Sequence, residues 1–262
     1  MRPRASALLV ALLLAVFGLL GSSPAAALQP RMPAAAVPGI PTVGPLFLFT
    51  TVLPHFCSAS VIASPHADLI LTAGHCLAGT ETGIQFAPGY DNGATPYGVW
   101  TVRRAYVDPA WAQRQDPQHD YAILQVDHQV RDGRWVGVQD VVGANVLGLA
   151  PQPGTTVTVD GYPFGSNDRP LTCTNTVRRF DGYPRFDCLD LAGGTSGGPW
   201  LVHTGDPRLT FTVGVIGGLH QGGCTDAVSY SSAFTWEVYV LWLRAVLGAP
   251  ADFVPFPGPD GC

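Results

Sequence analysis

The chain has 262 residues but no lysine and only two glutamates, Glu81 and Glu237. Charged residues make up 13% of the sequence, the net charge is −5, and no segment carries a basic stripe. Proteins that bind nucleic acid usually present clustered positive charge, so we expect no nucleic-acid partner. The sequence also lacks an apolar run of about 20 residues, the length that a membrane-spanning helix needs.

The longest apolar run near the N-terminus, residues 7–20, has the pattern of an export signal. It follows Arg2 and Arg4 and precedes the small residues Ala25–Ala27, which suit a signal peptidase. We therefore predict a signal peptide at 1–27 and a secreted, extracellular protein without membrane contact once it is removed. The six cysteines agree with an oxidising compartment, although sequence alone does not select their pairing.

Glycine and proline are abundant, at 31 and 24 residues, which favours many turns and argues against long helices. Six short β-type runs fit a small antiparallel barrel between residues 42 and 130. These runs are 46–53, 57–63, one ending at Thr72, 83–87, 97–107 and 121–126. A second series lies between residues 154 and 234, namely 155–161, 171–180, 186–189, 200–203, 210–219 and 228–234.

The remaining segments give the domain organisation. Residues 28–41, rich in Pro and Ala, are interpreted as a short pro-segment or an extended lead-in, and residues 131–153 as the connection between the two strand series. A helix is predicted over 235–248, followed by a Pro-rich tail, 249–262, which we expect to be held only by its last cysteine. The helix prediction rests on apolar residues at helical spacing: Val238, Leu241, Trp242, Ala245 and Val246.

Ser196 lies in the glycine-rich stretch 193–199, where glycines let the backbone approach a ligand and leave N–H groups beside the hydroxyl. A nucleophile with an oxyanion hole needs this arrangement, although an ordinary turn has the same composition. A serine also needs a base, and the base needs an acid that orients it. His75, in one expected helical turn after a strand, and Asp120, at the mouth of a strand, supply both types. Each has a simpler explanation when taken alone: His75 as a core or surface histidine, Asp120 as a turn cap and Ser196 as a loop hydroxyl. Together they predict a catalytic triad.

The segments Leu71–Cys76, Asp120–Leu124 and Gly194–Pro199 resemble the signature blocks of trypsin-like (chymotrypsin-fold) serine proteases, in that family's chain order. The resemblance covers residues 42–248. It implies an all-β fold of two six-stranded antiparallel β-barrels, with the active site between them and a C-terminal helix. It also implies a monomeric serine endopeptidase that cleaves polypeptide substrates through an acyl-enzyme and needs no cofactor.

The resemblance assigns roles to individual residues. His75 would act as general base and then general acid, Asp120 would orient it, and Ser196 would attack the scissile carbonyl. The backbone N–H groups of Gly194 and Ser196 would form the oxyanion hole.

The family also has a disulfide behind the histidine, which matches Cys57 and Cys76. We pair Cys173 with Cys188, which leaves Cys224 for Cys262. The alternative pairs Cys188 with Cys224 and would tie together two walls of the specificity pocket.

Two departures from the family pattern concern activation and the triad. Thr195 stands where the animal digestive members have an Asp that pairs with a newly freed N-terminal ammonium, and no Ile-Val-Gly-Gly sequence occurs here. We therefore expect maturation without that ion pair, as in the secreted bacterial members. Gly217 stands roughly where the family often has a Ser that donates to the catalytic Asp, so Asp120 would lack that donor.

Two sets of residues predict opposite charge preferences for P1, the substrate residue before the cleaved bond. Asp190, six residues before Ser196, suits a basic P1 residue. The stretch around Gly218 and His220 resembles the pocket wall of bacterial glutamyl endopeptidases and suits an acidic one. The simpler interpretations are that Asp190 is an acidic loop residue and that His220 is a surface histidine. Because the chain contains so few Glu residues, an enzyme that cleaves after Glu would rarely cleave itself. This favours an acidic P1 residue.

Two alternative functions fit the sequence less well. Gly194–Gly198 matches the nucleophile elbow of α/β-hydrolases, but Pro199 and a β-like run follow it, and the triad order differs. A catalytically silent homologue that binds a partner usually lacks a triad residue, and all three are present here.

We predict no metal site, because the remaining histidines lack the spacing of structural zinc ligands and are interpreted as loop residues: His55, His66, His119, His128 and His203.

Overall fold

The computed structural model describes residues 32–79, 83–206 and 208–262, so the expected signal peptide at 1–27 lies outside the described residues. No helix within these ranges combines the length and apolar character needed to cross a membrane.

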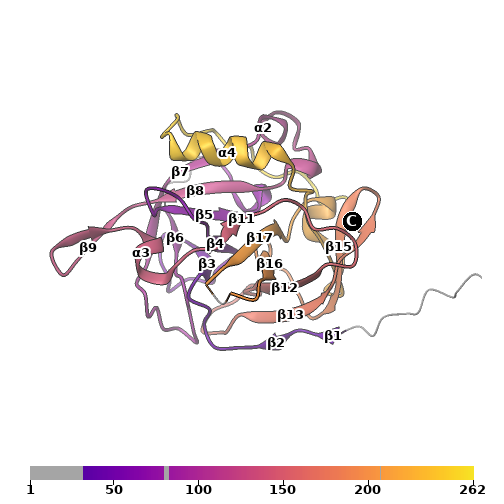
Figure 1. Ribbon diagram of the computed structural model, residues 1–262, viewed down its shortest axis with the longest axis horizontal. Helices are drawn as coiled ribbons and strands as arrows, with labels where there is room; N and C mark the ends of the chain where they lie inside the picture. The colour runs from indigo at the N-terminus through magenta and orange to yellow at the C-terminus, as the bar shows by residue number, and fades with distance from the viewer. Residues whose placement is uncertain (1–31, 80–82, 207) are drawn as a thin grey trace, which may run out of the picture. The chain divides into compact units, whose positions relative to one another are not determined.

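The first half of the chain forms a closed antiparallel barrel in the order β3-β4-β5-β8-β7-β6 (Figure 1). Its strands are β3 (Val43–Leu48), β4 (Cys57–Val61), β5 (Leu69–Thr72), β6 (Ile84–Phe86), β7 (Trp100–Val107) and β8 (Ala122–Val126). All six correspond to predicted runs. Leu46, Leu71 and Ile123 are among the fully buried apolar side chains that fill this half.

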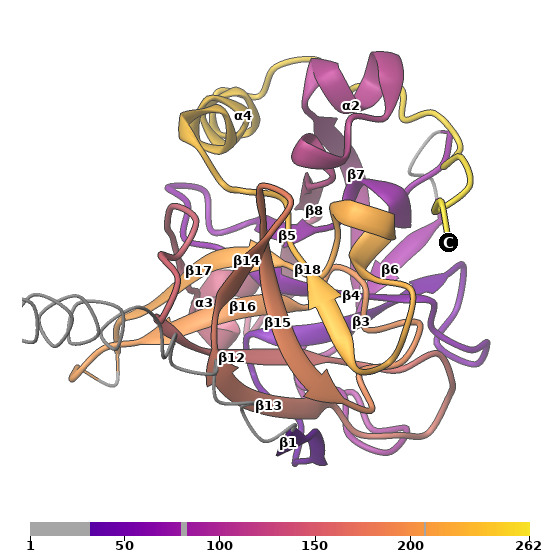
Figure 2. The same cartoon turned by 90° about the vertical axis from the view of Figure 1, so that its right-hand side faces the viewer.

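The second half also consists of strands, but its described pairings make two sheets instead of one closed ring (Figure 2). The larger sheet contains β11 (Val146–Leu147), β17 (Thr210–Val215), β16 (Pro199–His203), β12 (Thr156–Gly161), β13 (Leu171–Thr176) and β2 (Ala35–Ala36), in that order. The smaller contains β1 (Met32–Pro33), β15 (Tyr183–Leu189), β14 (Arg178–Phe180) and β18 (Val228–Tyr230). The fold is therefore mainly β, as predicted, with one barrel closed.

Strands β1 and β2 come from the segment that we interpreted as a pro-segment. β1 pairs in parallel with β15, and β2 pairs with β13. Between and after them, the Ala34 N–H donates to the Leu189 carbonyl (2.9 Å) and the Val37 N–H to the Pro170 carbonyl (3.0 Å). This segment therefore extends both sheets of the second half at their edges.

The predicted C-terminal helix is confirmed as α4 (Trp236–Val246), capped by the Thr235 hydroxyl, which accepts from the Glu237 N–H. Its buried residues Val238, Leu241 and Ala245 pack on the first barrel, over β7 and β8 (Figure 1).

Two short helices and a hairpin were not predicted. In α2 (Pro109–Arg114), the Asp108 side chain accepts from the Ala110 N–H and proline occupies the first turn. This is a recognisable start signal, but the helix is too short to show periodicity. The connection between the halves contains the hairpin β9 (Gln129–Arg131) and β10 (Arg134–Val136), and α3 (Val138–Val142).

The C-terminal tail is held by more than its last cysteine, contrary to our expectation. Val254 pairs with Gly79, whose N–H donates to the Val254 carbonyl (2.7 Å). The Asp252 carboxylate accepts from the Val107 N–H (3.0 Å) and from Arg244 (2.8 Å). The tail is therefore fixed to the first barrel before it reaches Cys262.

Candidate active site

His75 and Asp120 form a tightly connected pair. His75 lies in the single 3₁₀ turn η1 (Gly74–Cys76) after β5, which is the helical turn predicted at this place. Its Nδ1 lies 2.8 Å from Asp120 Oδ2, and its backbone N–H donates to Asp120 Oδ1 at 2.8 Å. An ionised carboxylate only accepts, so with Asp120 ionised Nδ1 is the donor and Nε2 of the neutral ring keeps its lone pair. The pair can therefore present a basic nitrogen to a neighbouring group.

Asp120 has a third donor, which compensates for the glycine at position 217. The Gly218 N–H donates to Asp120 Oδ2 at 2.8 Å. A Cβ at Gly217 would lie 3.1 Å from the same oxygen, so there is little room for a side chain. A backbone group thus supplies the hydrogen bond that we expected a serine hydroxyl to provide in the wider family.

The Ser196 segment lies against the strand end that leads to His75. The Ser58 N–H donates to the Ser196 carbonyl at 2.7 Å, which joins the second half of the chain to β4. Gly197 has φ 77° and packs so closely on Thr72 and Ala73 that a side chain would collide with them. Glycine is therefore required immediately after Ser196.

The two N–H groups predicted for the oxyanion hole are unoccupied by protein acceptors. Among the described residues, neither the Gly194 nor the Ser196 N–H has a hydrogen-bond acceptor. The Gly193 carbonyl accepts from the Phe164 N–H at 2.6 Å. The C=O and N–H of a trans peptide point in opposite directions, so the Gly194 N–H points away from Phe164.

Thr195 closes the turn in front of these donors. It is 2% exposed, and its hydroxyl donates to the Ala192 carbonyl at 2.7 Å. Its N–H donates to the same carbonyl at 3.2 Å. The threonine therefore stabilises the turn locally and needs no distant charged partner.

Ser58 was not singled out by sequence reasoning. Its hydroxyl is fully buried, donates to the Gly194 carbonyl (3.2 Å) and accepts from the Tyr162 N–H (2.8 Å). It therefore orders the peptide that follows Gly194. Its position next to Cys57 was the only available signal, and that signal says nothing about its contacts.

A cavity of about 130 Å³ lies beside Ser196. Neither Asp190 nor His220 is among its lining residues. Asp190 is exposed, with φ 70°, and His220 Nδ1 lies 3.0 Å from the Asp260 carbonyl. Gly218 contacts Ser232 and Asp120 instead. The lining consists of Leu191, Ala192, Gly193, Thr195, Ser196, Ile216, Gln221, Gly222, Gly223, Cys224, Thr225, Asp226, Val228 and Ser229.

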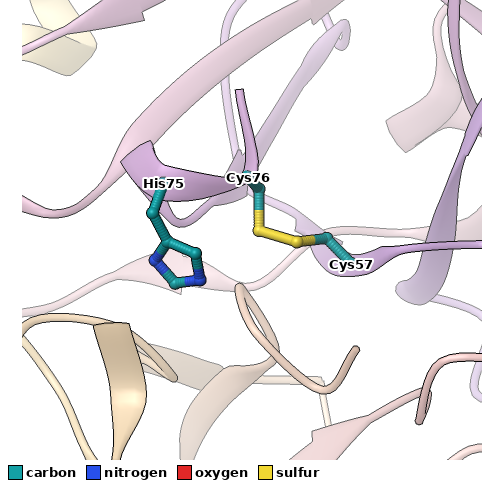
Figure 3. A group of neighbouring side chains, drawn as sticks. All are labelled: Cys57, His75 and Cys76. Carbon is teal, nitrogen blue, oxygen red and sulfur yellow. A yellow bond between two sulfur atoms is a disulfide. The ribbon is translucent and has the colours of Figure 1, made fainter. Parts of the chain in front are cut away.

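All six cysteines form disulfides, in the pairs Cys57–Cys76, Cys173–Cys188 and Cys224–Cys262. Figure 3 shows His75 beside the first of them. The two sulfur atoms near His75 are bonded to each other, so neither is available as a thiolate ligand for a metal. The bridge instead ties η1 to β4, the strand that also contacts Ser196.

A family model described as a trypsin-like peptidase domain matches residues 57–226, a range that contains His75, Asp120 and Ser196. The chain belongs to this family. It therefore has the fold of the trypsin-like peptidases.

Similar proteins are bacterial or microbial proteases. The extracellular metalloprotease of Bacillus subtilis is 24% identical over 149 residues, which cover 55% of this chain and 46% of that protein. The chain thus matches less than half of the length of this relative.

Solved structures agree with the fold. Protease Anisep from Arthrobacter nicotinovorans has a TM-score of 0.66 at 23% identity and covers 82% of this chain and 99% of its own. The thermostable serine protease AL20 from an extremophilic microorganism has a TM-score of 0.64 at 26% identity, covering 79% and 98%. A Glu endopeptidase has a TM-score of 0.61 at 18% identity, covering 82% and 98%.

Proposed function

We propose that this trypsin-like peptidase is a secreted serine endopeptidase that cleaves polypeptides through an acyl-enzyme on Ser196. The observation that carries the proposal is the buried Asp120 carboxylate, which accepts from both the ring and the backbone of His75. It fixes the tautomer that makes Nε2 a base. The Gly194 and Ser196 N–H groups, which have no acceptor among the described residues, support the same reaction.

The proposed reaction has two halves. Ser196 Oγ attacks the peptide carbonyl while its proton passes to His75 Nε2, and the carbonyl oxygen becomes an oxyanion that accepts from Gly194 and Ser196. His75 then protonates the leaving amine, which leaves the acyl group on Ser196. Water, deprotonated by His75, repeats the sequence and releases the acid. Asp120 stays ionised throughout and stabilises the imidazolium.

Labelling with a fluorophosphonate, which phosphonylates an activated serine, tests this proposal. We expect stoichiometric label on the folded native protein and none on Ser196→Ala. Ser166→Ala is the matched control, because it removes an exposed serine outside the site and should label normally. Absence of label from the folded native protein would instead support the rival function, a silent homologue that acts as an extracellular binding protein.

For the P1 residue, the cavity lining favours uncharged or basic side chains over acidic ones. None of the described lining residues is basic, and the carboxylate of Asp226, an exposed lining residue, has no ion-pair partner in the described chain. An acidic P1 residue would have to approach this carboxylate without a counter-charge. This proposal replaces His220 and Asp190 with Asp226 as the residue that determines charge preference.

For maturation, we propose that the signal at 1–27 is removed and that residues 32–41 are retained. Cleavage near residue 41 would remove β1 and β2 from the edges of both sheets of the second half. It would also remove Gly39, whose N–H donates to Asp91 at 3.2 Å. N-terminal sequencing of exported protein should give a start before Met32; a start after residue 41 would contradict the proposal.

A further inference from the structure

His55 lies in the connection between β3 and β4, in agreement with its interpretation as a loop residue, but it is fully buried. Its Nε2 lies 2.8 Å from Asp168 Oδ1. The imidazole packs edge-on against Phe47, Tyr90 and Tyr162, with ring centroids 5.4, 5.9 and 5.8 Å away. The two partners are 113 residues apart in the chain. A partly buried, charge-assisted hydrogen bond over this separation fixes two segments relative to each other.

Asp168 ends a short loop, residues 162–168, that is held to the first half of the chain. The His55 N–H donates to the Gly165 carbonyl (2.8 Å), and the Asn92 N–H donates to the Asp168 carbonyl (2.7 Å). The Tyr162 hydroxyl donates to the Tyr90 carbonyl (2.7 Å). His55 therefore holds the loop at two points: its backbone binds Gly165 in the middle of the loop, and its side chain binds Asp168 at the end.

The same loop contacts the peptide that carries the oxyanion donor. The Phe164 N–H donates to the Gly193 carbonyl at 2.6 Å and thereby orients the Gly194 N–H. Gly194, with φ 95°, packs on the Phe164 backbone so closely that a side chain would collide with it. A shift of Phe164 would free the Gly193–Gly194 peptide to rotate and to turn its N–H away from the substrate.

We propose that His55 and Asp168 are positioning residues for the oxyanion hole, acting through Phe164. They hold the loop whose N–H group keeps the Gly193–Gly194 peptide in its productive orientation. The pair thus does the work that a freed N-terminal ammonium does in the animal digestive members, for which Thr195 offers no carboxylate. The inference rests on the proposed serine peptidase function, because it concerns a hydrogen bond to the developing oxyanion.

Two single variants and their combination test the pair. Asp168→Ala removes the carboxylate. His55→Phe keeps an aromatic ring packed among Phe47, Tyr90 and Tyr162 but removes Nε2. Loss of one oxyanion donor costs about 100- to 1000-fold in kcat, so partial misorientation should lower kcat about 10- to 100-fold with little change in KM. The double variant should be no slower than the worse single variant, because both break one link. Asp168→Asn, which keeps an acceptor oxygen, should recover most of the activity.

An inhibitor pair separates positioning from general loss of structure. A peptidyl trifluoromethyl ketone forms an oxyanion in the hole, whereas the matching peptidyl alcohol binds the same subsites without one. In Asp168→Ala, the ketone should bind more weakly in proportion to the fall in kcat, and the alcohol should bind as before. Ser166→Ala, in the same loop but without a hydrogen bond from its side chain in the described structure, should match the native enzyme in both.

Unchanged kcat in folded Asp168→Ala and His55→Phe would overturn the inference. Equal weakening of the ketone and the alcohol would overturn it too, since the loop would then serve only the fold. Failure of the proposed function is recognised separately, because the native protein would then not react with a fluorophosphonate.

Discussion

Asp160 is a buried carboxyl group next to the nucleophile segment, and it has no part in the proposed reaction. It is 3% exposed, and its Oδ1 has no hydrogen-bond partner in the described structure. Burial raises the pKa of Asp160 to about 6, an effect that a hydrogen bond with Thr172 partly offsets. Ionised Asp160 therefore destabilises the fold, because the unfolded chain solvates the charge better.

This predicts a pH-dependent difference between the native protein and Asp160→Asn. Since the folded pKa is raised, the stabilising effect of the proton is fully present below about pH 4 and is lost as the pH rises through about 6. Relative to native protein, Asp160→Asn should gain about 3 kcal/mol of unfolding free energy between pH 4 and pH 8. Denaturant unfolding of both proteins at several pH values measures it. A difference that does not vary with pH would show that Asp160 is not a buried titrating group.

The P1 proposal is tested with two substrates that differ only in charge. Peptides with P1-Gln and P1-Glu have the same shape, so their kcat/KM ratio reports the electrostatics of the cavity. We expect P1-Gln to be preferred by about tenfold, equivalent to about 1.4 kcal/mol. Asp226→Asn should bring the ratio close to one. Preference of the native enzyme for P1-Glu would restore the prediction of acidic specificity.

The residues of the site differ in how far sequence could predict them. His75, Asp120 and Ser196 each lie in a distinctive local stretch, so their types and order suggested the chemistry. Phe164 acts on Gly193 through its backbone N–H, which every non-proline residue possesses, and therefore leaves no signature. The His55–Asp168 pair was missed for a related reason, because its partners meet only after both halves have folded.

At the scale of elements, prediction succeeded where the hydrophobic pattern was long enough. The six barrel strands and α4 have clear runs or periodicity. By contrast, β1, β2 and β11 have two residues each and are defined by pairing with distant strands. Such short strands have no period to detect, so the role of the N-terminal segment depended on the structure.

Helix α4 offers a direct test of its packing on the barrel. Leu241 is 2% exposed, whereas Leu243 on the same helix is 48% exposed. Leu241→Ala should lower the unfolding free energy by about 2–5 kcal/mol through lost burial and a cavity, and Leu243→Ala by less than about 1 kcal/mol. Guanidinium unfolding of the two variants measures the difference. Equal losses would mean that α4 does not anchor through the Leu241 face.

At the scale of the whole molecule, the C-terminal tail connects the first barrel to the wall of the cavity beside Ser196. Gln221 Nε2 donates to the Gly258 carbonyl (2.7 Å), and Cys224 is bonded to Cys262. Gln221 in this wall and His220 immediately before it both have left-handed backbones, with φ 50° and φ 54°. Such conformations are unfavourable and persist where neighbouring contacts hold them.

Deletion of residues 258–262 should therefore disturb substrate binding more than chemistry. We expect KM for a peptide substrate to rise about tenfold, with a smaller change in kcat, because the wall relaxes while His75 and Asp120 stay in place. Pro259→Ala is the control, since it leaves the Gln221 and Cys224 contacts intact. Steady-state kinetics measure both constants. Native KM in the deleted protein would show that the wall holds its shape without the tail.

The central claim, an acyl-enzyme on Ser196, is tested most directly by trapping that intermediate. The folded protein is mixed with an activated ester substrate, quenched in acid within the first turnover, and analysed by intact mass and peptide mapping. We predict one acyl group per molecule, located on the peptide that contains Ser196, and none in Ser196→Ala. Turnover of the substrate with no acyl group on Ser196, or with the group on another residue, would contradict the account.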